Sequence, residues 1–323
     1  MAQTVDVHLS PEDMRSQMLA DARKGLLAEQ KSIPPVWFYD ERGSQLFEDI
    51  TQLPEYYPTR AERALLEAHA PSIAELAKAD TLVELGAGAC EKTRVLLTAL
   101  QDLDILARYV PFDVSDQFLR SAAATLAQEY DSLDIHVVVG DFHQHLAEIP
   151  DQGRRLIAFL GGTIGNLNPA QRARFLFDLN CTMSSDDSLL IGTDLVKDRR
   201  RLVAAYDDSA GVTAAFNRNV LHVLNAQLGA DFLPDDFTHV ALWNEDEQWI
   251  EMRLRAERAN DVTLVDAGIS VHFEEGEELL TEISAKFTPE RIERELSEAG
   301  FVVEGMWGAE EGEFLLTLAH PFC

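Results

Sequence analysis

The chain has 323 residues, of which 46% are hydrophobic and 26% are charged. These proportions are typical of a globular protein with one large domain or two modest ones. The 56 acidic side chains outnumber the 27 basic ones, which gives a formal net charge of −29 at pH 7. A surface this negative repels phosphate groups, and this argues against nucleic acids and anionic membranes as partners.

The sequence carries no signal for a membrane or for secretion. No apolar run approaches the roughly 20 residues of a membrane span. The segment Met1–Pro11 is polar and acidic, without the basic start and the apolar stretch of a signal peptide. We therefore expect a cytoplasmic protein.

Cysteine and histidine spacing argues against structural cross-links. The three cysteines, Cys90, Cys181 and Cys323, are an odd number without a CxxC spacing, which fits a reducing cytosol and argues against disulfides or a zinc site. His143 and His145 lie close together but lack paired cysteines or a third nearby histidine. We therefore expect no metal ion.

The first sixty residues contain one helical pattern and two segments rich in proline and aromatic residues. Leu19–Leu27 is expected to be helical. Ser32–Tyr39 and Pro54–Pro58 are expected to be extended or turn-like, because proline fixes the backbone. These segments either clasp the N-terminus onto the domain or form a pocket wall that presents Tyr39 and Tyr56. The residues by themselves favour the clasp.

Between residues 81 and 194, short apolar runs alternate with longer segments of helical periodicity. Strands are expected at Thr81–Leu85, Tyr109–Phe112, Ile135–Val139, Leu156–Leu160 and Ser188–Ile191, and helices at Glu91–Leu100, Asp116–Glu129 and Pro169–Met183. Strands that alternate with helices predict a parallel, doubly wound sheet, because parallel neighbours need crossover connections.

This alternation stops after Asp194. Arg201–Leu228 is expected to be helical, with an interruption near Gly211. Two hairpin-like pairs of strands follow, His239–Trp243 with Trp249–Leu254 and Val262–Val265 with Ile269–Phe273. The pattern predicts a smaller α+β domain with an antiparallel sheet, inserted into the first domain.

The alternation resumes near the end of the chain, with a helix at Pro289–Ala299 and strands at Val302–Met306 and Phe314–Leu318. Only the short acidic turn Gly308–Glu313 separates these strands, so we expect them to pair antiparallel. The predicted organisation is an N-terminal segment (1–60) that contributes to the smaller domain, a doubly wound domain in two parts (61–195 and 287–323) and the inserted domain (196–286).

A glycine-rich run, VELGAGACEKT (83–93), follows the strand expected at Thr81–Leu85 and opens the next helix. Gly86 and Gly88 allow the tight turn and the close backbone approach that a nucleotide needs. A dinucleotide fingerprint would place a third glycine where Glu91 stands, and a carboxylate near a helix N-terminus would repel a pyrophosphate. The run also lacks the GxxxxGK[ST] pattern of a P-loop. S-adenosylmethionine has no phosphate, and Lys92 would face the carboxylate of its methionyl part.

The ends of the next three strands support this cofactor. Asp113 would accept hydrogen bonds from both ribose hydroxyls, although it could equally cap the following helix. Asp141 would accept from the adenine amino group while Phe142 covers the ring. The small-residue loop Leu160–Asn166 would let the methyl group meet its acceptor. Together with Gly86, these strand ends predict an S-adenosylmethionine-dependent methyltransferase.

The predicted fold is therefore that of a class I methyltransferase. This is a Rossmann-like α/β doubly wound sheet that ends in an antiparallel hairpin, here joined to a smaller α+β substrate-binding domain.

Seven longer runs carry a resemblance to one family. They are KSIPPVWFYD (31–40), LPEYYPTR (53–60), VELG (83–86), LGGTIGNL (160–167), GTDLVK (192–197), FNRN (216–219) and LTEISAKF (280–287). Spread over nearly the whole chain, they resemble the histidine-specific Nα-methyltransferases of ergothioneine biosynthesis. The resemblance implies transfer of three methyl groups from S-adenosylmethionine to the α-nitrogen of free L-histidine, giving hercynine. No heptad pattern indicates a partner chain, so we expect a monomer.

The resemblance also implies roles for individual residues. The cofactor would contact Phe47, Gly86, Lys92, Asp113, Asp141 and Phe142. Histidine would be held by Asn166 and Tyr206 at its carboxylate and by Tyr56, Glu282 and Ser284 at its imidazole ring, with Met252 shaping the pocket. Tyr39, Gly161 and Thr163 would form the catalytic group, with Tyr39 beside the amine.

The chemistry suits this assignment. Methyl transfer is an in-line displacement, so alignment of the reacting atoms contributes most of the catalysis. Binding the carboxylate and the ring, rather than the amine, leaves the nitrogen able to rotate through three rounds. An acceptor at Glu282 would select a ring N–H donor.

Glu282 has a second interpretation as an exposed strand carboxylate. Alternation in LTEIS places Glu282 and Ser284 on one face and Thr281 and Ile283 on the other, which both interpretations require. Spacing alone favours the exposed carboxylate. Two rival functions are methylation of another aromatic amino acid such as tryptophan, and a binding protein that keeps the fold without catalysis.

Two departures from the family affect the cofactor loops. The run from Ala87 through Ala89 to Cys90 stands where the family usually has Ser-Gly-Thr-Ser, and Gly162 stands where it has a serine. Lost hydroxyls would weaken cofactor hydrogen bonds without changing the backbone geometry. We expect altered cofactor affinity rather than lost activity.

Overall fold

The computed structural model describes residues 4–88, 90, 92–130, 132–309 and 312–322. The chain divides into two compact units. Unit 1 comprises Met1–Ser10, Pro58–Val196 and Phe287–Cys323, and unit 2 comprises Pro11–Tyr57 and Lys197–Lys286. The N-terminal segment is therefore split between the units, because residues 4–7 pair with the large sheet of unit 1.

Unit 1 is built on an eight-stranded sheet. Its strands are β1 (Thr4–Val7), β2 (Thr81–Leu85), β3 (Arg108–Asp113), β4 (Asp134–Val139), β5 (Arg155–Phe159), β6 (Ser188–Asp194), β12 (Phe301–Gly308) and β13 (Phe314–Pro321). They lie in the order β1-β4-β3-β2-β5-β6-β13-β12. β1 to β6 run parallel to one another, whereas β13 pairs antiparallel with both β6 and β12. The predicted class I methyltransferase fold is confirmed, and β1 is an edge strand that the sequence did not predict.

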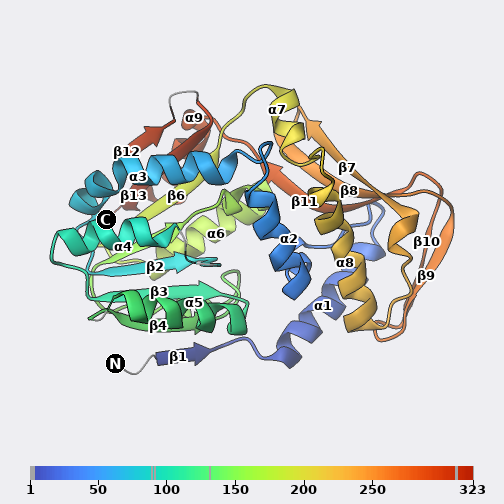
Figure 1. Ribbon diagram of the computed structural model, residues 1–323, viewed down its shortest axis with the longest axis horizontal. Coiled ribbons are helices and arrows are strands. Elements are labelled where there is room, and N and C mark those ends of the chain that lie inside the picture. The colour runs from blue at the N-terminus through green and yellow to red at the C-terminus, as the bar shows by residue number, and fades with distance from the viewer. Residues whose placement is uncertain (1–3, 89, 91, 131, 310–311, 323) are drawn as a thin grey trace. The chain divides into compact units, whose positions relative to one another are not determined.

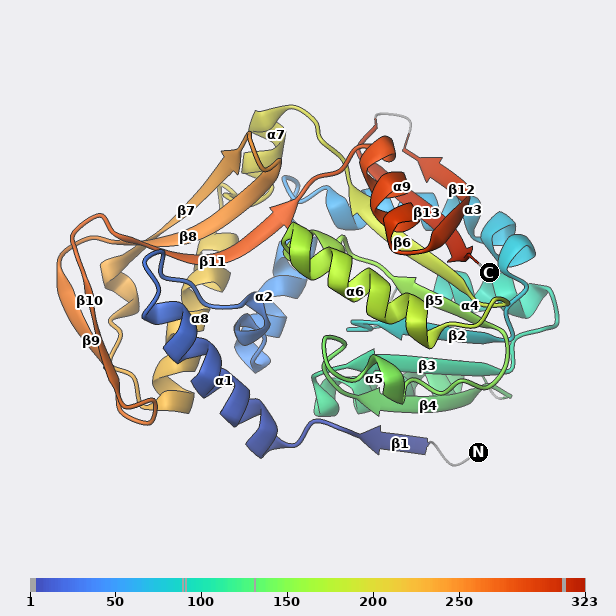
Figure 2. The same ribbon diagram turned by 180° about the vertical axis from the view of Figure 1, so that it is seen from behind.

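Helices cover both faces of this sheet. They are α3 (Pro58–Ala77), α4 (Thr93–Asp102), α5 (Asp116–Glu129), α6 (Pro169–Thr182) and α9 (Pro289–Glu298). α3 and α4 lie in front of the sheet in Figure 1, whereas α6 and α9 lie in front in the reverse view of Figure 2. Every residue of β2 and β5 is buried, as expected for strands that are covered on both faces.

Unit 2 combines two small antiparallel sheets with helices. A three-stranded sheet has the order β11 (Glu278–Ala285), β8 (Trp249–Ala256), β7 (Phe237–Asn244), and β9 (Asn260–Leu264) pairs with β10 (Ile269–Phe273). The helices are α1 (Pro11–Leu26), α2 (Glu41–Thr51), α7 (Arg199–Ala204) and α8 (Val212–Leu228). Both predicted hairpins are confirmed. Gly211, with a φ of +74°, ends the interruption between α7 and α8 in a left-handed conformation that favours glycine.

Two helices, α2 and α3, were not predicted from the sequence. The N-terminus of α2 is capped by Asp40, whose Oδ1 accepts from the Gly43 N–H at 2.7 Å. α3 carries Pro71 in its interior, which hid its helical pattern. In the part of the chain that the structure describes, no helix is long and apolar enough to cross a membrane. The same residues include no group of three side chains arranged to hold a metal ion.

Candidate active site

The glycine-rich loop after β2 adopts a backbone that suits glycine. Gly86 and Gly88 have φ values of +72° and +50°, and a Cβ at either would meet nothing within 4 Å. The Gly86 N–H donates to the Phe112 carbonyl at 2.8 Å, which ties the loop to β3. The loop therefore faces open space at the C-terminal edge of the sheet. Ala89 and Glu91 lie outside the described residues.

Asp113, at the end of β3, is fixed by backbone donors. Its carboxylate accepts from the N–H groups of Gly88 at 3.1 Å and Ser115 at 3.0 Å. Ser115, rather than Asp113, is the N-cap of α5, so Asp113 links the glycine loop to the start of that helix. Burial raises the pKa of Asp113. A carboxylate has roughly four acceptor positions, and the backbone contacts of Asp113 occupy only part of this capacity.

Asp141 and Phe142 follow β4 at the same edge. Asp141 is buried and accepts from the His143 N–H at 2.9 Å and from Gln144 Nε2 at 3.0 Å. The half-buried Phe142 ring packs edge-on against Phe159 at 5.4 Å between centroids. Both side chains are therefore held in fixed orientations beside the loop after β5.

The loop after β5 is anchored by a glutamate that the sequence did not reveal. Glu62 on α3 is completely buried, and both its oxygens accept from the Gly161 N–H, at 2.7 and 2.9 Å. Its carboxylate also pairs with the Lys92 ammonium. Gly192 leaves room for it, since a Cβ there would lie 2.0 Å from Glu62 Oε1. Glu62 thus joins the start of α4 to the loop after β5.

The rest of that loop is a tight turn. Gly161 and Gly162 have φ values of +78° and +67°, and Thr163 Oγ1 donates to the Leu160 carbonyl at 2.9 Å. Asn166 ends the short 3-10 helix Thr163–Asn166 and is half-buried. The three predicted residues Gly161, Thr163 and Asn166 therefore share one turn of unit 1.

This edge of unit 1 fits S-adenosylmethionine better than a phosphate-bearing nucleotide. Asp113 and Asp141 offer acceptors, which suit hydroxyl and amino donors. The Lys92 charge is already balanced by Glu62, so this lysine is less available to pair with a phosphate. That Lys92 also faces the methionyl carboxylate stays a prediction.

Beneath the glycine loop lies a buried polar cluster. Glu84 accepts from the hydroxyls of Thr93 and Tyr109, the latter at 2.8 Å, and burial raises the pKa of Glu84 to about 7. Cys90 Sγ lies 3.3 Å from the Tyr109 hydroxyl, and burial raises the pKa of its thiol to about 12. Cys90, one of the residues that depart from the family pattern, therefore directs its side chain into the protein.

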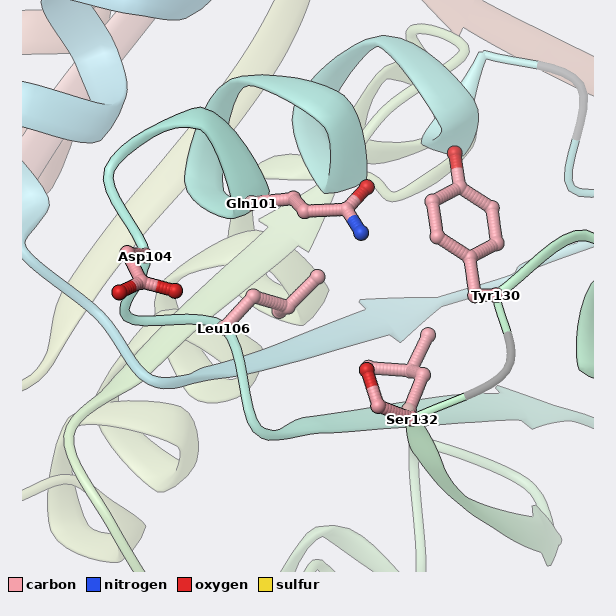
Figure 3. Close-up of a pocket in the computed structure, with 6 residues that line it drawn as sticks. Gln101, Asp104, Leu106, Tyr130 and Ser132 are labelled. Atoms are coloured by element: carbon pink, nitrogen blue, oxygen red, sulfur yellow. The ribbon is translucent and has the colours of Figure 1, made fainter.

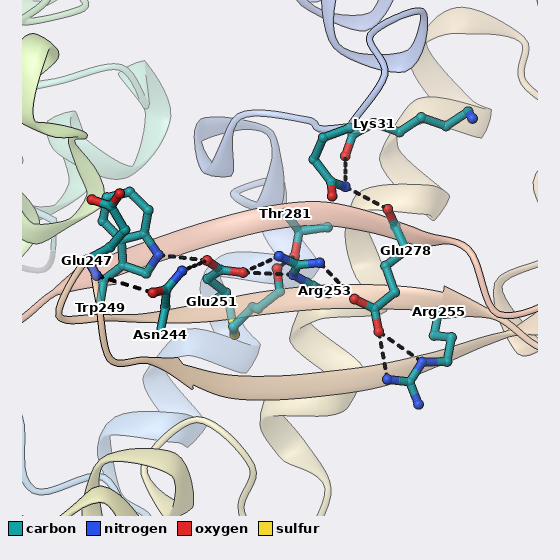
Figure 4. Close-up of polar contacts among 11 residues, drawn as sticks. Lys31, Asn244, Glu247, Trp249, Glu251, Arg253, Arg255, Glu278 and Thr281 are labelled. Carbon is teal, nitrogen blue, oxygen red and sulfur yellow. Dashed lines mark hydrogen bonds and ion pairs between the residues drawn. The ribbon is translucent and has the colours of Figure 1, made fainter.

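In unit 2, a polar network covers one face of the three-stranded sheet (Figure 4). Arg253 on β8 pairs with Glu251 on its own strand and with Glu278 on β11, with 2.8 Å between Nη1 and Glu278 Oε2. Arg255 adds a second pair to Glu278 at 2.6 Å. The network bonds β8 to β11 and fixes their register.

A bulge in β11 places the predicted imidazole-binding pair on the other face. Leu280 pairs with Arg253, but Glu282 pairs with Met252, so Thr281 is an extra residue. Thr281 Oγ1 donates to the Met252 carbonyl at 2.9 Å. Residues directly opposite each other share a face of an antiparallel sheet. Glu282 therefore lies on the Met252 face, away from the polar network.

Glu282 has an unusual environment for a carboxyl group. The residue is half-buried, and among the described residues its side chain makes no hydrogen bond and no ion pair. Burial raises the pKa of Glu282 to about 7, against the opposing effect of the nearby Lys286 charge. An N–H donor from a ligand would supply what the protein does not.

Next to Glu282 on the strand, Ser284 belongs to a buried triangle of polar atoms. The Tyr206 hydroxyl lies 2.8 Å from Ser284 Oγ. The Lys286 ammonium donates to both of these oxygens, each at 2.9 Å. The sequence did not single out Lys286, although it lies two residues after Ser284 and strand alternation would have placed both on one face.

Tyr206 is also held through its backbone. Asn217 Nδ2 lies 2.8 Å from His239 Nδ1, and His239 Nε2 lies 2.8 Å from the Tyr206 carbonyl. Because the amide nitrogen only donates, Nδ1 accepts and Nε2 carries the hydrogen. Burial lowers the pKa of His239, in the direction that favours the neutral ring. Sequence reasoning missed both residues.

The N-terminal aromatic segments form a ring cluster inside unit 2. Tyr39 contacts Phe47 at 5.7 Å and Phe216 at 5.5 Å between centroids. Tyr56 contacts Phe47 at 6.3 Å and Tyr206 at 6.2 Å. The ring contacts connect Tyr39 to Tyr206 through Phe47 and Tyr56. That these rings form a pocket wall, and that Phe47 contacts the cofactor, stay predictions.

A small polar pocket lies elsewhere in unit 1 (Figure 3). It is lined by Gln101, Asp104, Leu106, Tyr130, Ser132 and Leu133. These residues lie in the last turn of α4 or in the segments between α4 and β3 and between α5 and β4, so the pocket lies at the N-terminal edge of the strands. Cofactors of doubly wound sheets bind at the opposite, C-terminal edge, so we do not assign the active site to this pocket.

The predicted residues thus form one group in each unit. Unit 1 holds Gly86, Lys92, Asp113, Asp141, Phe142, Gly161, Thr163 and Asn166, and unit 2 holds Tyr39, Phe47, Tyr56, Tyr206, Met252, Glu282 and Ser284. Their individual roles stay predictions.

Known proteins resemble this chain over its whole length. It is 54% identical over 312 residues to the histidine N-alpha-methyltransferase of Mycolicibacterium smegmatis, covering 97% of each chain. It is 51% identical over 319 residues to the protein of the same name from Mycobacterium tuberculosis, covering 99% of each. It is 31% identical over 296 residues to ergothioneine biosynthesis protein 1 of Neurospora crassa, covering 88% of this chain and 33% of that protein.

A family model gives the same result. Residues 18–321 match the family described as histidine-specific, S-adenosylmethionine-dependent methyltransferases. The match spans both units, including the inserted part. The chain therefore belongs to the histidine-specific, S-adenosylmethionine-dependent methyltransferases.

Proposed function

We propose that this enzyme transfers three methyl groups from S-adenosylmethionine to the α-amino nitrogen of free L-histidine, giving hercynine for ergothioneine biosynthesis. The observation that carries the proposal is Glu282, a half-buried acceptor without a hydrogen-bonding partner among the described residues, on the same strand as Ser284. An imidazole ring carries one N–H donor and one acceptor nitrogen, which suit a carboxylate and a hydroxyl. The names of the bacterial relatives support histidine as the substrate.

In this proposal, unit 2 holds the substrate by its ends. Glu282 and Ser284 bind the imidazole ring with Tyr56 against it, and Met252 closes the pocket beside Glu282. Tyr206 would bind the carboxylate, and the role of Asn166 at the carboxylate stays a prediction. An analogue without the ring N–H would leave the half-buried Glu282 acceptor unpaired, which is a basis for discrimination.

Unit 1 supplies the groups for the methyl donor. Asp113 would bind the ribose hydroxyls and Asp141 the adenine amino group, with Phe142 against the ring. When bound, S-adenosylmethionine provides an electrophilic methyl group. Gly161 and Thr163 line the turn beside which transfer would occur, and their fixed backbone favours in-line alignment.

The substrate amine must lose its proton before it reacts. Tyr39, which is 40% exposed, would lie beside the amine and pass the proton to water. Because no contact of the chain to the amine nitrogen is required for binding, mono- and dimethylated histidine remain substrates.

We also propose that the enzyme acts as a cytoplasmic monomer. The odd number of cysteines and the net charge of −29 support this. Light scattering during size-exclusion chromatography should give the mass of one chain, and a concentration-independent dimer would contradict the proposal.

The direct test is mass spectrometry of L-histidine incubated with the purified enzyme and excess S-adenosylmethionine. Trimethylated histidine should accumulate, whereas an arrest after one methyl group would contradict the proposal. Calorimetry with the demethylated cofactor present should show binding of histidine and none of tryptophan. Preferential binding of tryptophan would favour the rival substrate, and binding without turnover would indicate a non-catalytic protein.

A further inference from the structure

Lys286 is a lysine in the interior of unit 2. The residue is completely buried, directly after the last residue of β11. Lysine is almost never fully buried unless it is paired, because removing an ammonium from water is costly. Its environment therefore needs an explanation that the assigned roles do not provide.

The Lys286 ammonium is bound by the two hydroxyls that are assigned to the substrate. Nζ lies 2.9 Å from the Tyr206 hydroxyl and 2.9 Å from Ser284 Oγ, and these oxygens lie 2.8 Å apart. Nζ also lies 4.7 Å from the centroid of the Tyr206 ring, within the range of a cation–π contact. One ammonium thus contacts a side chain from the segment between α7 and α8 and a side chain from β11.

The chemistry of these groups fixes the direction of the hydrogen bonds. An ammonium only donates, so both hydroxyl oxygens accept from Lys286. A single hydrogen lies between Tyr206 and Ser284, so one of them donates to the other. The hydroxyl that accepts from its neighbour directs its own hydrogen elsewhere. The triangle therefore presents one hydroxyl donor, polarised by a positive charge.

We propose that Lys286 is a positioning residue for substrate recognition. Because both hydroxyl oxygens accept from its ammonium, the one hydroxyl hydrogen of Tyr206 and Ser284 that is left over is directed toward an acceptor of histidine, either its carboxylate or its unprotonated ring nitrogen. This inference rests on the proposed function. The carboxylate and the unprotonated ring nitrogen are both hydrogen-bond acceptors, so either group matches the donor that the triangle presents. Without the ammonium, each hydroxyl would be able to rotate and offer a lone pair instead.

The first test compares Lys286→Met with the parent by calorimetry, with the demethylated cofactor bound. Methionine has a similar length and no donor. We expect the dissociation constant of L-histidine to rise at least tenfold and that of the demethylated cofactor to stay within twofold. Unchanged histidine affinity in the folded variant would overturn the proposal.

Lys31→Met is the matched control in the same unit. Lys31 pairs with Glu277 and lies over the Phe273 ring at 5.1 Å, so it is a partly buried lysine that has an aromatic neighbour, as Lys286 has. Its loss should leave histidine affinity within twofold. An equal loss in both variants would show that any lysine removal from unit 2 weakens binding, and this would overturn a specific role for Lys286.

A double-mutant cycle separates positioning from general stability. If Lys286 acts through Ser284, then Lys286→Met in the Ser284→Ala background should weaken histidine binding less than threefold. If the two substitutions instead weakened histidine binding independently, so that their fold-effects on the dissociation constant multiplied, the proposal would be overturned. If Lys286→Met does not fold, the cycle of Tyr206→Phe and Ser284→Ala replaces it. The shared ammonium predicts coupled effects on histidine affinity there, and independent effects would again overturn the proposal.

The parent enzyme distinguishes the two proposals. If the parent does not methylate histidine, the proposed function fails. If the parent methylates histidine and Lys286→Met binds histidine equally well, only the role of Lys286 fails.

Discussion

Glu62 in unit 1 and Glu282 in unit 2 show two uses of a carboxyl group. Glu62 is completely buried and is bound by the Gly161 N–H and the Lys92 ammonium. Glu282 is half-buried and has no hydrogen bond or ion pair among the described side chains. A carboxylate that the protein satisfies holds its loops together, whereas one that the protein leaves unsatisfied needs a donor from a ligand.

Glu84 is a useful third case, because its pKa is raised in the same direction as that of Glu282. Burial raises both to about 7. Glu84, however, accepts from two hydroxyls of unit 1, those of Thr93 and Tyr109. A raised pKa by itself therefore does not identify a ligand-binding group, and the hydrogen-bonding partners decide.

The largest expected effect is that of Glu62→Gln. The amide would still accept from the Gly161 N–H but would lose the ion pair with Lys92 and leave that charge uncompensated. We expect the free energy of unfolding, measured with urea, to fall by about 3 kcal/mol, and the demethylated cofactor to bind more weakly.

Glu67→Gln on the same helix is the control for Glu62. Glu67 pairs with Arg63 at the surface, where both side chains are more than half exposed, so it should change the free energy of unfolding by less than about 0.5 kcal/mol. A similar loss in both variants would contradict the distinction between the two glutamates.

Glu282→Ala should lower kcat/KM for histidine about 100-fold, which is the expected loss of a charged hydrogen bond to the ring. Calorimetry should show unchanged binding of the demethylated cofactor. Glu278→Ala, on the opposite face of the same strand, should lower kcat/KM for histidine less than about threefold, because Glu278 does not face the proposed ring site. Equal turnover in Glu282→Ala and the parent would contradict the assignment of Glu282.

Glu84 and Glu282 should also give the protein a pH-dependent stability. Their folded pKa values of about 7 exceed the ordinary value of 4.5, so the folded state holds these protons more tightly. This stabilisation is fully present below pH 4.5 and is lost as the pH rises through 7. Each Glu→Gln variant should therefore lose less stability than the parent between pH 5 and pH 8, by roughly 2 kcal/mol.

Histidine binding should separate these two glutamates. Glu282→Gln should change the pH dependence of the histidine dissociation constant around pH 7, since it removes a titrating group that binds the ring. Glu84→Gln should leave that dependence as in the parent. Equal changes in both variants would mean that titration of Glu84 also reaches the substrate.

The smallest expected effect is that of Thr281→Val in the bulge of β11. The variant keeps the shape but loses the hydrogen bond to the Met252 carbonyl, and thermal unfolding should show a loss of about 1 kcal/mol. Thr263→Val, whose exposed hydroxyl contacts Ser270, should cost clearly less. A larger loss at Thr263 would show that the bulge does not depend on this bond.

The sequence predicted the parts of unit 1 that have strong local signals. The strand at Thr81–Leu85 and the helix at Asp116–Glu129 have the predicted bounds. Local composition and periodicity are enough to predict buried strands and alanine-rich helices. α2 and α3 were missed. Their polar starts and the interior Pro71 weaken the helical pattern, and packing against the rest of each unit stabilises them instead.

The sequence by itself determined the fold class and the family, because strand alternation, the glycine loop and seven long runs are local patterns. Only the tertiary structure decided which carboxyl groups have partners. Glu62 and Gly161 are 99 residues apart in the sequence, and Tyr206 and Lys286 are 80 residues apart. No local periodicity relates positions so distant. The bulge at Thr281 likewise depends on pairing between β11 and β8, and it sets the face on which Glu282 lies.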